Sequence, residues 1–400
     1  MVGKMKQKVV IIGIYENNRL AMIRPLGKIG YDIDVIALGN RVSKKGVDSY
    51  SKYVSNYYQC KEDEGLGVVD FLMNLCKDHS QKAVLIPVDD FSVVLLDNNY
   101  NILKDNFLLP NIHEEQGAIV KWMNKDVQKT HALKCGLNVV DSKTVEIVKG
   151  AYILPTGISY PCFPKTQYYV KGAKQFLRKC SDETELIRVL DSICGLQNDV
   201  IVIIEDFKEI EREFSIGGFS DGNNVVISGV IEKQTISNGV TMTGRIVPIS
   251  GYEVLVDKYK NFIRSIGFWG VFDFDLFRSG DEFYFCELNL RYGGTGYAYI
   301  KKGINLPEML VRSLRGNPVE DININISTVS SFVNEKVCLK SWYKGKMTTK
   351  EYLRVMESSD LFLYKDDNDP IPGQLFVKRM KNLRLRRFIR KVLKSISGNT

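Results

Sequence analysis

A short run of alternating polar residues carries the groups best suited to chemistry. Glu287, Asn289 and Arg291 stand at every second position of the segment ELNLRYGG. The preceding residues 283–286, FYFC, are aromatic or apolar and predict a strand that runs into Glu287. Because side chains on a strand alternate between its two faces, we expect the carboxylate, the amide and the guanidinium to point the same way.

A second strand upstream adds further carboxylates. Residues 272–277, FDFDLF, place Asp273 and Asp275 on one face, and the intervening Ser279-Gly280-Asp281 predicts a hairpin turn. The hairpin therefore collects carboxylate and amide oxygens with one guanidinium, and it contains no His. This donor set suits Mg²⁺, with a phosphate bridging the metal and the guanidinium. The alternative is a solvated face, although the opposite face of both strands is aromatic or aliphatic.

The N-terminal region alternates between strand and helix patterns. Apolar runs at 8–14, 32–38 and 83–88 predict strands, and helical periodicity is found at 18–29, 68–79 and 91–101. This alternation predicts a doubly wound parallel α/β sheet. The first turn lacks the three-glycine fingerprint, which disfavours a dinucleotide there. Asp89 and Asp90 follow a predicted parallel strand, where they either contact a ligand or cap the next helix.

A mostly antiparallel α+β region begins near residue 111. Helices are predicted at 121–135, 182–192, 252–266 and 306–314, and strands at 161–165, 200–204, 213–219, 225–232 and 245–249, before the hairpin. A smaller region from about 321 to 374 closes the fold and includes a turn-rich loop at 366–373. We therefore divide the chain into domains at 1–110, 111–320 and 321–375, followed by a basic tail at 376–400.

Composition excludes several classes of protein. The 400 residues are 44% hydrophobic and 26% charged, no run is long and apolar enough for a membrane span, and the start does not read as a signal peptide. The eight cysteines show no C-x-x-C spacing, and the three histidines are widely separated. We therefore expect neither a zinc site, a disulfide framework nor Ser-His-Asp chemistry, and a reducing cytoplasm fits best.

The excess positive charge is confined to the C-terminal tail. The net charge is +8, and nine of the 55 Lys and Arg residues lie between Lys378 and Lys394, where no Asp or Glu occurs. The rest of the chain contains 46 Lys and Arg against 47 Asp and Glu, so its net charge is close to zero. This distribution argues against broad nucleic-acid binding by the body of the protein. The apolar residues of the tail fall on one helical face: Leu385, Phe388, Ile389, Val392, Leu393 and Ile396. A basic amphipathic helix is typical of an anionic membrane surface; the alternatives are a helix docked on the body and an RNA-binding end.

Further polar groups lie upstream of the hairpin. Lys125 stands near the start of a predicted helix, and Lys165 ends a predicted strand, where a lysine can reach a nucleotide phosphate. Each could equally be a surface lysine. The segment Glu205-Asp206-Phe207-Lys208 ends another apolar strand and could form a hinge whose backbone reads an adenine edge.

The order of these parts resembles the ATP-grasp superfamily over about residues 8 to 318. The most specific part of the resemblance is the block from Asp275 to Arg291 with the following Gly293-Gly294. It implies a pre-grasp α/β domain followed by an antiparallel ATP-grasp domain. For the nucleotide, the resemblance implies Lys125 and Lys165 at the ATP phosphates, Glu205, Asp206, Phe207 and Lys208 at adenine, and Glu213 at ribose. For two Mg²⁺ ions or Mn²⁺, it implies Asp275, Glu287 and Asn289 as ligands. Arg291 would bind the transferred phosphoryl group and, as a weaker match, Arg245 would bind a substrate or phosphate.

The chain departs from the superfamily pattern at the loop that covers the phosphates. Here that loop would be Thr166 to Lys179, which holds one glycine, Gly172, where relatives are rich in Gly and Ser. Lys174 could partly compensate as a phosphate ligand. Thr166 stands where many relatives have Pro, and Asn124 where many have Asp before the lysine. These differences put the closure of the loop in doubt and leave the metal site untouched.

The resemblance implies an ATP- and Mg²⁺-dependent carboxylate–amine ligase. A carboxylate would attack the γ-phosphate to give an acyl phosphate and ADP, and an amine would then release phosphate. One alternative is an acyl phosphate former of the carbamoyl-phosphate synthase or carboxylase kind, although neither a glutaminase nor a biotin carrier is evident in the sequence. Another is an inactive nucleotide-binding scaffold.

The expected substrates are a carboxylate and an amine, either small molecules or lipid- or sugar-linked. The basic tail suggests an enzyme at the inner face of the cell membrane that acts on a cell-envelope or polysaccharide precursor, with a layout nearest to D-aspartate ligases and polysaccharide-biosynthesis ATP-grasp proteins. We expect a cytoplasmic protein that does not bind nucleic acid, and we consider a homodimer. The sequence identifies neither the acid nor the amine.

Overall fold

A computed structural model describes residues 7–39, 45–61, 65–76, 81–167, 170, 173–197, 199–237, 239–317 and 326–381, and for Leu66 and Lys174 it describes the backbone only. The chain forms two compact units. The first contains Met1–Gly136, Arg212–Leu276 and Cys286–Thr400, and the second contains Leu137–Glu211 and Phe277–Phe285. The predicted division into four domains stays a prediction.

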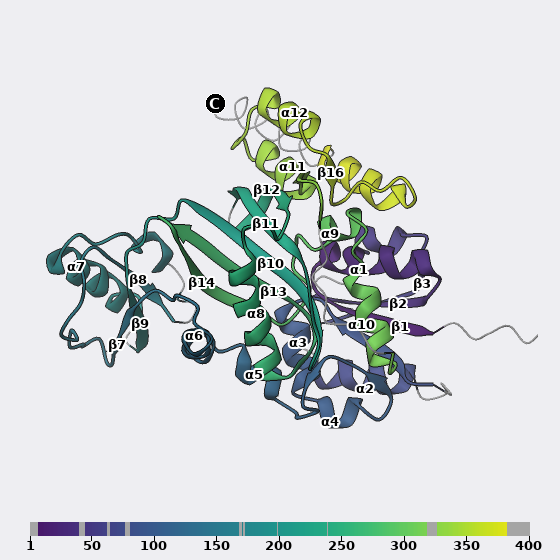
Figure 1. The fold of residues 1–400 in the computed structure, drawn as a ribbon, viewed down its shortest axis with the longest axis horizontal. Helices are drawn as coiled ribbons and strands as arrows, with labels where there is room; N and C mark the ends of the chain where they lie inside the picture. The colour runs from purple at the N-terminus through teal and green to yellow at the C-terminus, as the bar shows by residue number, and fades with distance from the viewer. Residues whose placement is uncertain are drawn as a thin grey trace, which may run out of the picture. The chain divides into compact units, whose positions relative to one another are not determined.

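A parallel sheet forms the N-terminal part of the first unit (Figure 1). Its strand order is β3-β2-β1-β4-β5, and every neighbouring pair is parallel. The strands are β1 (Lys8–Gly13), β2 (Asp32–Leu38), β3 (Val54–Cys60), β4 (Ala83–Pro87) and β5 (Phe107–Leu108). The helices are α1 (Glu16–Ile29), α2 (Gly65–Leu75), α3 (Asp90–Asp97) and α4 (Tyr100–Leu103). The doubly wound sheet predicted from the sequence is confirmed.

Burial explains which of these elements the sequence revealed. Strands β1, β2 and β4 are apolar and buried, so their sequence patterns are strong. Strand β3 was missed because it is an edge strand, half-exposed and partly polar. The predicted helix at 91–101 is interrupted, because α3 ends at Asp97 and α4 begins at Tyr100.

A larger sheet makes up the rest of the first unit, together with the C-terminal region. As far as the chain is described, its order is β14-β13-β10-β11-β12-β15-β16, and β6 pairs with β13. The strands are β6 (Asn111–Ile112), β10 (Arg212–Asp221), β11 (Val225–Ser237), β12 (Val240–Val247), β13 (Phe268–Ser279), β14 (Glu282–Asn289), β15 (Ser330–Val333) and β16 (Leu361–Phe362). The associated helices are α5 (Ala118–Trp122), α6 (Lys125–Lys134), α8 (Glu253–Ile266), α9 (Tyr297–Lys301) and α10 (Leu306–Leu314).

One hydrophobic core joins the two sheets of the first unit. It contains Ile11 of β1, Leu26 of α1, Phe219 of β10 and Val271 of β13, all of them buried, together with buried residues of α9 and α10. A second core covers the other face of the parallel sheet with α2, α3 and α4. The parallel sheet and the carboxylate hairpin therefore belong to one packed body, which fixes their side chains relative to each other.

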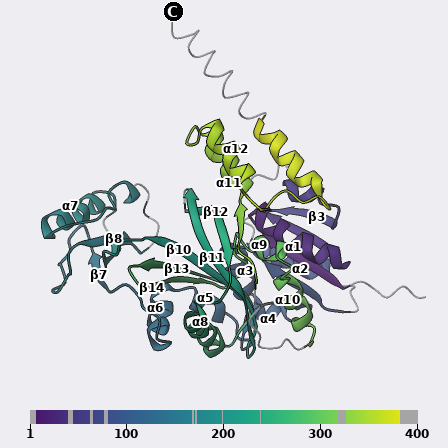
Figure 2. The same ribbon diagram turned by 45° about the horizontal axis from the view of Figure 1, so that its top comes forward.

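The second unit is a three-stranded antiparallel sheet with one long helix (Figures 1 and 2). Strand β9 (Val200–Asp206) lies between β7 (Ser142–Ile147) and β8 (Cys162–Thr166). Helix α7 (Glu183–Cys194) packs on the sheet through Leu186 and other buried aliphatic side chains. Its N-cap is Asp182, whose side chain accepts a hydrogen bond from the backbone N–H of Glu185.

The C-terminal region adds two helices, α11 (Glu335–Tyr343) and α12 (Thr349–Glu357), and a further helix at 370–381. The prediction of a turn-rich loop at 366–373 was wrong for its second half, because Pro370 starts this helix and proline is well tolerated in a first helical turn. The predicted amphipathic tail from 382 onward lies outside the described residues. Within the described ranges, no helix is both long enough and apolar enough to span a bilayer.

Ion pairs attach the C-terminal region to the N-terminal sheet. The guanidinium of Arg24 in α1 pairs with Asp369 at 3.0 Å, and both side chains are buried. Asp366 accepts hydrogen bonds from the Tyr297 hydroxyl at 2.6 Å and from the Lys301 Nζ at 3.0 Å. Burial alone would raise the pKa of Asp366, but these contacts outweigh burial and hold it well below its ordinary value.

We predict that Asp366→Asn lowers the free energy of unfolding at pH 7, by roughly 1–3 kcal/mol for a buried charged hydrogen-bond acceptor. Because the pKa of Asp366 is depressed in the folded state, its stabilisation is present above the unfolded pKa of about 3.9 and is lost as the pH falls below that value. Urea titrations at pH 7 and pH 3 should show the difference from wild type shrinking at the lower pH. Asp367→Asn, at an exposed neighbour, is the control, and an unchanged difference at pH 3 would contradict the assignment.

Candidate functional site

The carboxylate hairpin forms as the sequence indicates. Asp275 lies on β13, Glu287 and Asn289 lie on the neighbouring β14, and Arg291 follows directly. Each acidic group is held by a cation of the same unit. Glu287 pairs with the Nζ of Lys125 at 2.9 Å, and Asp275 pairs with the Nζ of Lys233 at 2.5 Å.

Lys233 is a site residue that the sequence analysis missed. It lies on β11, its side chain is 11% exposed, and its Nζ is also 3.8 Å from Glu213, the residue predicted to bind ribose. Burial alone would lower the pKa of Lys233, but Asp275 outweighs it and raises the pKa, so this lysine stays charged. The available signal was a pair of charged residues, Glu232 and Lys233, directly after the buried half of β11.

Asp273 adds a third carboxylate to the cluster. It is 8% exposed, and burial together with the charge of Asp275 raises its pKa to about 8, against the opposing effect of Lys233 and Arg291. Gly293 packs directly on this carboxyl group, since a Cβ at position 293 would lie 2.2 Å from Oδ2 of Asp273. The sequence placed Asp273 on the correct face but not among the site residues.

Arg291 connects the hairpin to the parallel sheet. Its Nε and Nη2 bind both carboxylate oxygens of Asp90, at 2.5 and 3.3 Å, and Nη2 also donates to Oδ1 of Asn289 at 3.1 Å. Asp90 begins α3, at the carboxyl end of β4. Of the two uses considered for Asp89 and Asp90, Asp89 takes the helix cap, in a capping box with Ser92.

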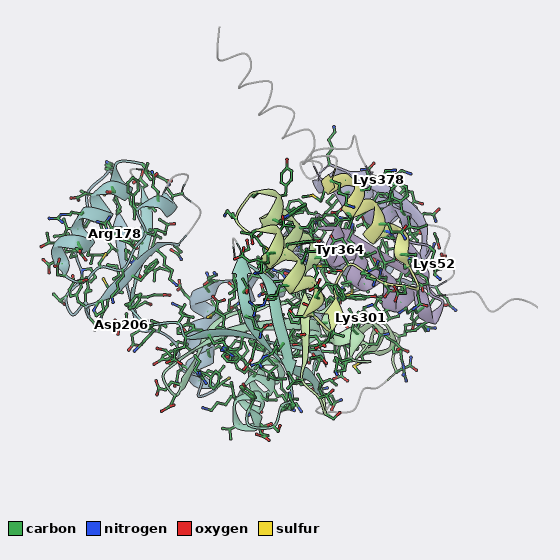
Figure 3. All side chains as sticks on the ribbon, turned by 90° about the horizontal axis from the view of Figure 1, so that it is seen from above. Lys52, Arg178, Asp206, Lys301, Tyr364 and Lys378 are labelled. Atoms are coloured by element: carbon green, nitrogen blue, oxygen red, sulfur yellow. The ribbon has the colours of Figure 1, made fainter. Side chains whose placement is uncertain are left out.

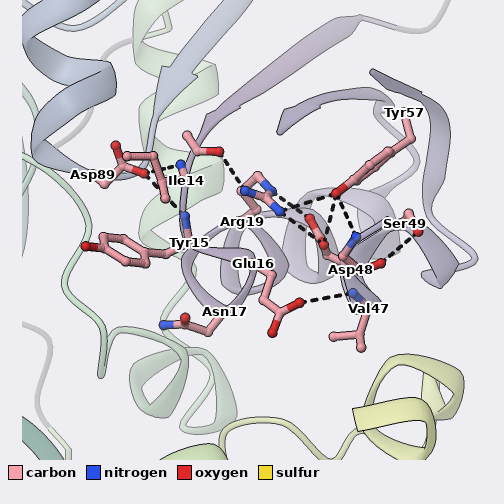
Figure 4. A network of polar contacts seen from close by, with 12 residues as sticks. Ile14, Tyr15, Glu16, Asn17, Arg19, Val47, Asp48, Ser49, Tyr57 and Asp89 are labelled. Atoms are coloured by element: carbon pink, nitrogen blue, oxygen red, sulfur yellow. Dashed lines mark hydrogen bonds and ion pairs between the residues drawn. The ribbon is translucent and has the colours of Figure 1, made fainter. Parts of the chain in front are cut away.

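Asp89, the N-cap of α3, also connects two turns of the parallel sheet. Oδ2 of Asp89 accepts the backbone N–H groups of Ile14 at 2.5 Å and of Tyr15 at 3.4 Å (Figure 4). The side chain of Asn18 donates to the carbonyl oxygen of Val88 at 2.9 Å. The turns after β1 and β4 are therefore fixed next to each other, where the strand order of the sheet reverses.

Lys125 owes its position to a break in the predicted helix 121–135. The segment is two helices, α5 and α6, because Asn124 caps α6 by accepting the backbone N–H groups of Asp126 at 2.9 Å and of Val127 at 3.2 Å. Asn124 therefore performs the capping function of an Asp. Gln128, also missed from the sequence, exchanges two 2.8 Å hydrogen bonds with the backbone of Leu288 and so fixes α6 on β14.

The second unit holds the residues predicted for adenine and for one phosphate. Lys165 on β8 forms an ion pair with Glu205 on β9. The expected hinge is partly strand, because β9 extends through Asp206, which is labelled in Figure 3. The Nζ of Lys179 lies 4.4 Å above the ring of Phe207, and the Nζ of Lys208 lies 5.4 Å above the ring of Tyr284.

Two further predicted residues, Arg245 and Lys174, are not placed in the site by any described contact. Arg245 on β12 pairs with Glu232 of β11, directly opposite in the strand register, at 2.5 Å. The side chain of Lys174 lies outside the described residues. Their roles as a substrate- or phosphate-binding arginine and as a phosphate lysine stay predictions.

The donors on the hairpin fit a hard cation by their chemistry. Asp275, Glu287 and Asn289 offer oxygen atoms only, from adjacent strands. Among the described residues, no three His, Cys, Asp or Glu side chains converge as a metal site. In the structure, Asp275 and Glu287 each contact an ammonium group, of Lys233 and Lys125 respectively.

The fold is shared with ATP-grasp proteins of known structure. Biotin carboxylase from Campylobacter jejuni, in an ATP complex, has a TM-score of 0.63 at 17% identity and covers 82% of this chain and 75% of that one. N5-carboxyaminoimidazole synthetase from Staphylococcus aureus has a TM-score of 0.61 at 15% identity over 86% of each chain. An L-amino acid ligase from Bacillus licheniformis has a TM-score of 0.62 at 15% identity, over 82% and 80%. The predicted ATP-grasp fold is confirmed.

Sequence comparison finds large chains of carbamoyl phosphate synthase. The protein from Pseudothermotoga lettingae is 25% identical over 213 residues, which are 52% of this chain and 18% of that protein. The C-terminal section from Aquifex aeolicus is 24% identical over 197 residues, 48% of this chain and 36% of that one. This chain therefore spans only a minor part of these relatives. No protein-family model matches it.

We predict that Gly293→Ala destabilises the protein by roughly 1–3 kcal/mol, the usual cost of overpacking, because its Cβ must displace the buried Asp273 carboxyl group. Urea denaturation measures the change. The adjacent Gly294→Ala is the matched control, since its Cβ would meet nothing closer than 3.9 Å, and it should stay within about 0.5 kcal/mol of wild type. Equal effects of the two substitutions would show that Gly293 is not a contact point for Asp273.

Proposed function

We propose that this protein is an ATP- and Mg²⁺-dependent ligase that joins a carboxylate to an amine through an acyl phosphate and releases ADP and phosphate. The observation that carries the proposal is the convergence of cationic side chains from other elements on the polar groups of the hairpin. Lys125 with Glu287, Lys233 with Asp275, and Arg291 with Asn289 meet within one packed unit. Phosphoryl transfer requires such charge, because its transition state spreads negative charge over the phosphoryl oxygens.

The proposal assigns two sets of residues to the nucleotide. In the first unit, Asp275, Glu287 and Asn289 would hold the metal, Lys125 would bind phosphate, and Glu213 would accept the ribose hydroxyl groups. In the second unit, Lys165 would bind phosphate, with Lys174, and the segment from Glu205 to Lys208 would bind adenine. Bound Mg²⁺ would neutralise the phosphate charge during transfer.

The chemistry needs no covalent enzyme intermediate. A substrate carboxylate oxygen attacks the γ-phosphorus, and the bond from that phosphorus to the bridging oxygen breaks, so that ADP leaves. The amine nitrogen then attacks the acyl carbon, phosphate leaves, and the amine loses a proton. Arg291 stabilises the phosphoryl group in both steps, so the route calls for charge stabilisation and not for an enzyme nucleophile.

The finer proposals concern substrate and location. All eight cysteines are free thiols, which fits a reducing cytoplasm. The basic segment 378–396 supports a peripheral position at an anionic membrane and, with it, an acceptor that is a cell-envelope or polysaccharide precursor. A homodimer is part of the proposal, and a dimer is named for one neighbour, a biotin carboxylase domain from Hydrogenobacter thermophilus.

A second candidate is a bicarbonate-phosphorylating enzyme. It is favoured by the sequence relatives, which are carbamoyl phosphate synthase large chains. The two candidates differ in the acid that they activate. Bicarbonate alone would stimulate ADP release in the second case, whereas an organic acid would be required in the first.

We predict that ADP and phosphate form from Mg²⁺-ATP only when both an acid and an amine are present, in a coupled assay over a panel of amino acids, sugar acids and bicarbonate. The double substitution Glu287→Gln with Asn289→Asp should reduce kcat/KM by about 100-fold or more, since it disrupts the charge and the donors of the metal site. Asp281→Asn, at the exposed turn of the same hairpin, is the control and should retain full activity.

Two outcomes would contradict the proposal. Full turnover in the Glu287→Gln, Asn289→Asp protein would remove the hairpin from the catalytic site. Tight binding of Mg²⁺-ATP without ADP release over the whole panel would favour the nucleotide-binding scaffold.

A further inference from the structure

A separate pocket of about 280 Å³ opens at the carboxyl ends of β1, β2 and β3. Its lining includes Tyr15, Glu16, Arg19, Gly39, Gln59 and, from α11, Lys336. In open α/β sheets, ligands bind outside the carboxyl ends of the strands. The volume lies just below the usual range of about 300–1,000 Å³ for drug-sized ligands, so the pocket suits a smaller molecule. We call it the Glu16 pocket.

The charge at the floor of the Glu16 pocket is neutralised internally. Arg19, 2% exposed, forms an ion pair with the buried Asp48 at 2.6 Å and donates to the carbonyl oxygen of Gly13 at 2.6 Å (Figure 4). Tyr57 also contacts this pair, at 3.4 Å from both partners. A buried, fully hydrogen-bonded pair of this kind is structural and leaves no net charge for a ligand.

Two opposite charges remain at the pocket wall. Oε1 of Glu16 lies 3.0 Å from the Nζ of Lys336, and the two side chains are 23% and 16% exposed. Oε2 of Glu16 accepts the backbone N–H of Val47 at 3.1 Å, which fixes the orientation of the carboxylate. Burial alone would raise the pKa of Glu16, but Lys336 and Val47 lower it, so the group is ionised at neutral pH. The pocket thus offers one anion and one cation side by side.

A buried hydroxyl group lies close to the same charges. Tyr364, labelled in Figure 3, is 3% exposed, and its hydroxyl has no hydrogen-bond partner in the described structure. Burial and the nearby carboxylates of Glu16 and Asp48 raise its pKa. Lys336 lies 5.7 Å from the centre of the Tyr364 ring. Tyr364 belongs to the lining of a neighbouring pocket, and a buried polar group without a partner carries a desolvation cost.

We propose that the Glu16 pocket binds a small zwitterion of the α-amino acid class, with its ammonium group on Glu16 and its carboxylate on Lys336, as one of the two substrates. This inference rests on the proposed ligase function and names a substrate class for it. The pocket shares the β1–α1 turn with the hairpin site. Tyr15 lines the pocket, while Asn18, three residues on, lies 3.9 Å from the Cβ position of Gly294.

The first experiment measures binding to the full-length protein without ATP. Isothermal titration with the twenty standard L-amino acids should identify at least one ligand. The N-acetyl and methyl ester derivatives of that amino acid, which remove the ammonium and the carboxylate charge respectively, should each bind at least about tenfold more weakly, as expected when one charged hydrogen bond is lost. Binding of both derivatives at the affinity of the parent amino acid would overturn the proposal.

The second experiment separates ligand binding from a structural ion pair. Glu16→Gln and Lys336→Met should each raise the KM for the amino acid at least about tenfold without changing the KM for ATP. Lys344→Met, at the exposed end of α11, is the control. In the charge-reversed protein, Glu16→Lys with Lys336→Glu, the ion pair can re-form, so the unfolding midpoint should recover relative to the single variants, while the KM should stay raised. Recovery of both the midpoint and the KM would show that the pair is only structural.

The two experiments also separate this inference from the proposed function. An amino acid that binds directly and loses affinity in Glu16→Gln supports the pocket even if no ADP is released. Amino-acid-dependent ADP release that is unchanged in Glu16→Gln and Lys336→Met supports the ligase and overturns the pocket. No binding and no stimulation by any amino acid overturns the pocket as well.

Discussion

The carboxylates of the β13–β14 hairpin must be balanced by cations from other parts of the chain. Asp273, Asp275 and Glu287 bring three carboxyl groups together in a partly buried place, and burial, together with the charge of Asp275, raises the pKa of Asp273. Burying such groups is tolerable only when cations offset them. Those cations come from other elements, Lys233 from β11 and Lys125 from α6. The arrangement of these charges therefore forms only when these elements are docked.

The sequence predicted the parts of this arrangement that depend on local pattern. Alternation along 272–277 and 283–291 was sufficient to place Asp275, Glu287, Asn289 and Arg291 on a hairpin, because side-chain direction in a strand follows from position alone. Buried strands such as β1 and β4 were found for the same reason. The order of the motifs then indicated the ATP-grasp fold, which the structural neighbours share.

Contacts between distant segments could not be predicted in this way. Lys233 and Gln128 are ordinary polar residues in the sequence. They reach the hairpin only because a single strand, β10, separates β11 from β13 in the folded sheet and because α6 packs on β14. The same holds for Asp90, whose partner is 201 residues away. Strand β3 and the break before Lys125 were missed because an exposed edge strand and a helix cap carry weak periodic signals.

The pairing of Arg291 with Asp90 connects chemistry to substrate selection under the proposed function. An arginine that stabilises a phosphoryl group must be pre-positioned yet able to exchange its partner. Asp90 meets the first condition because it binds the guanidinium of Arg291 through two oxygens. It meets the second because its side chain is 58% exposed, so that water and the N-terminus of α3 can stabilise its charge once Arg291 binds phosphate instead. The adjacent Asp89 holds the turn that leads to Glu16. The carboxyl edge of the parallel sheet thus contributes Asp90, which orients the arginine proposed to bind the phosphoryl group, and Asp89, which fixes the β1–α1 turn at the Glu16 pocket.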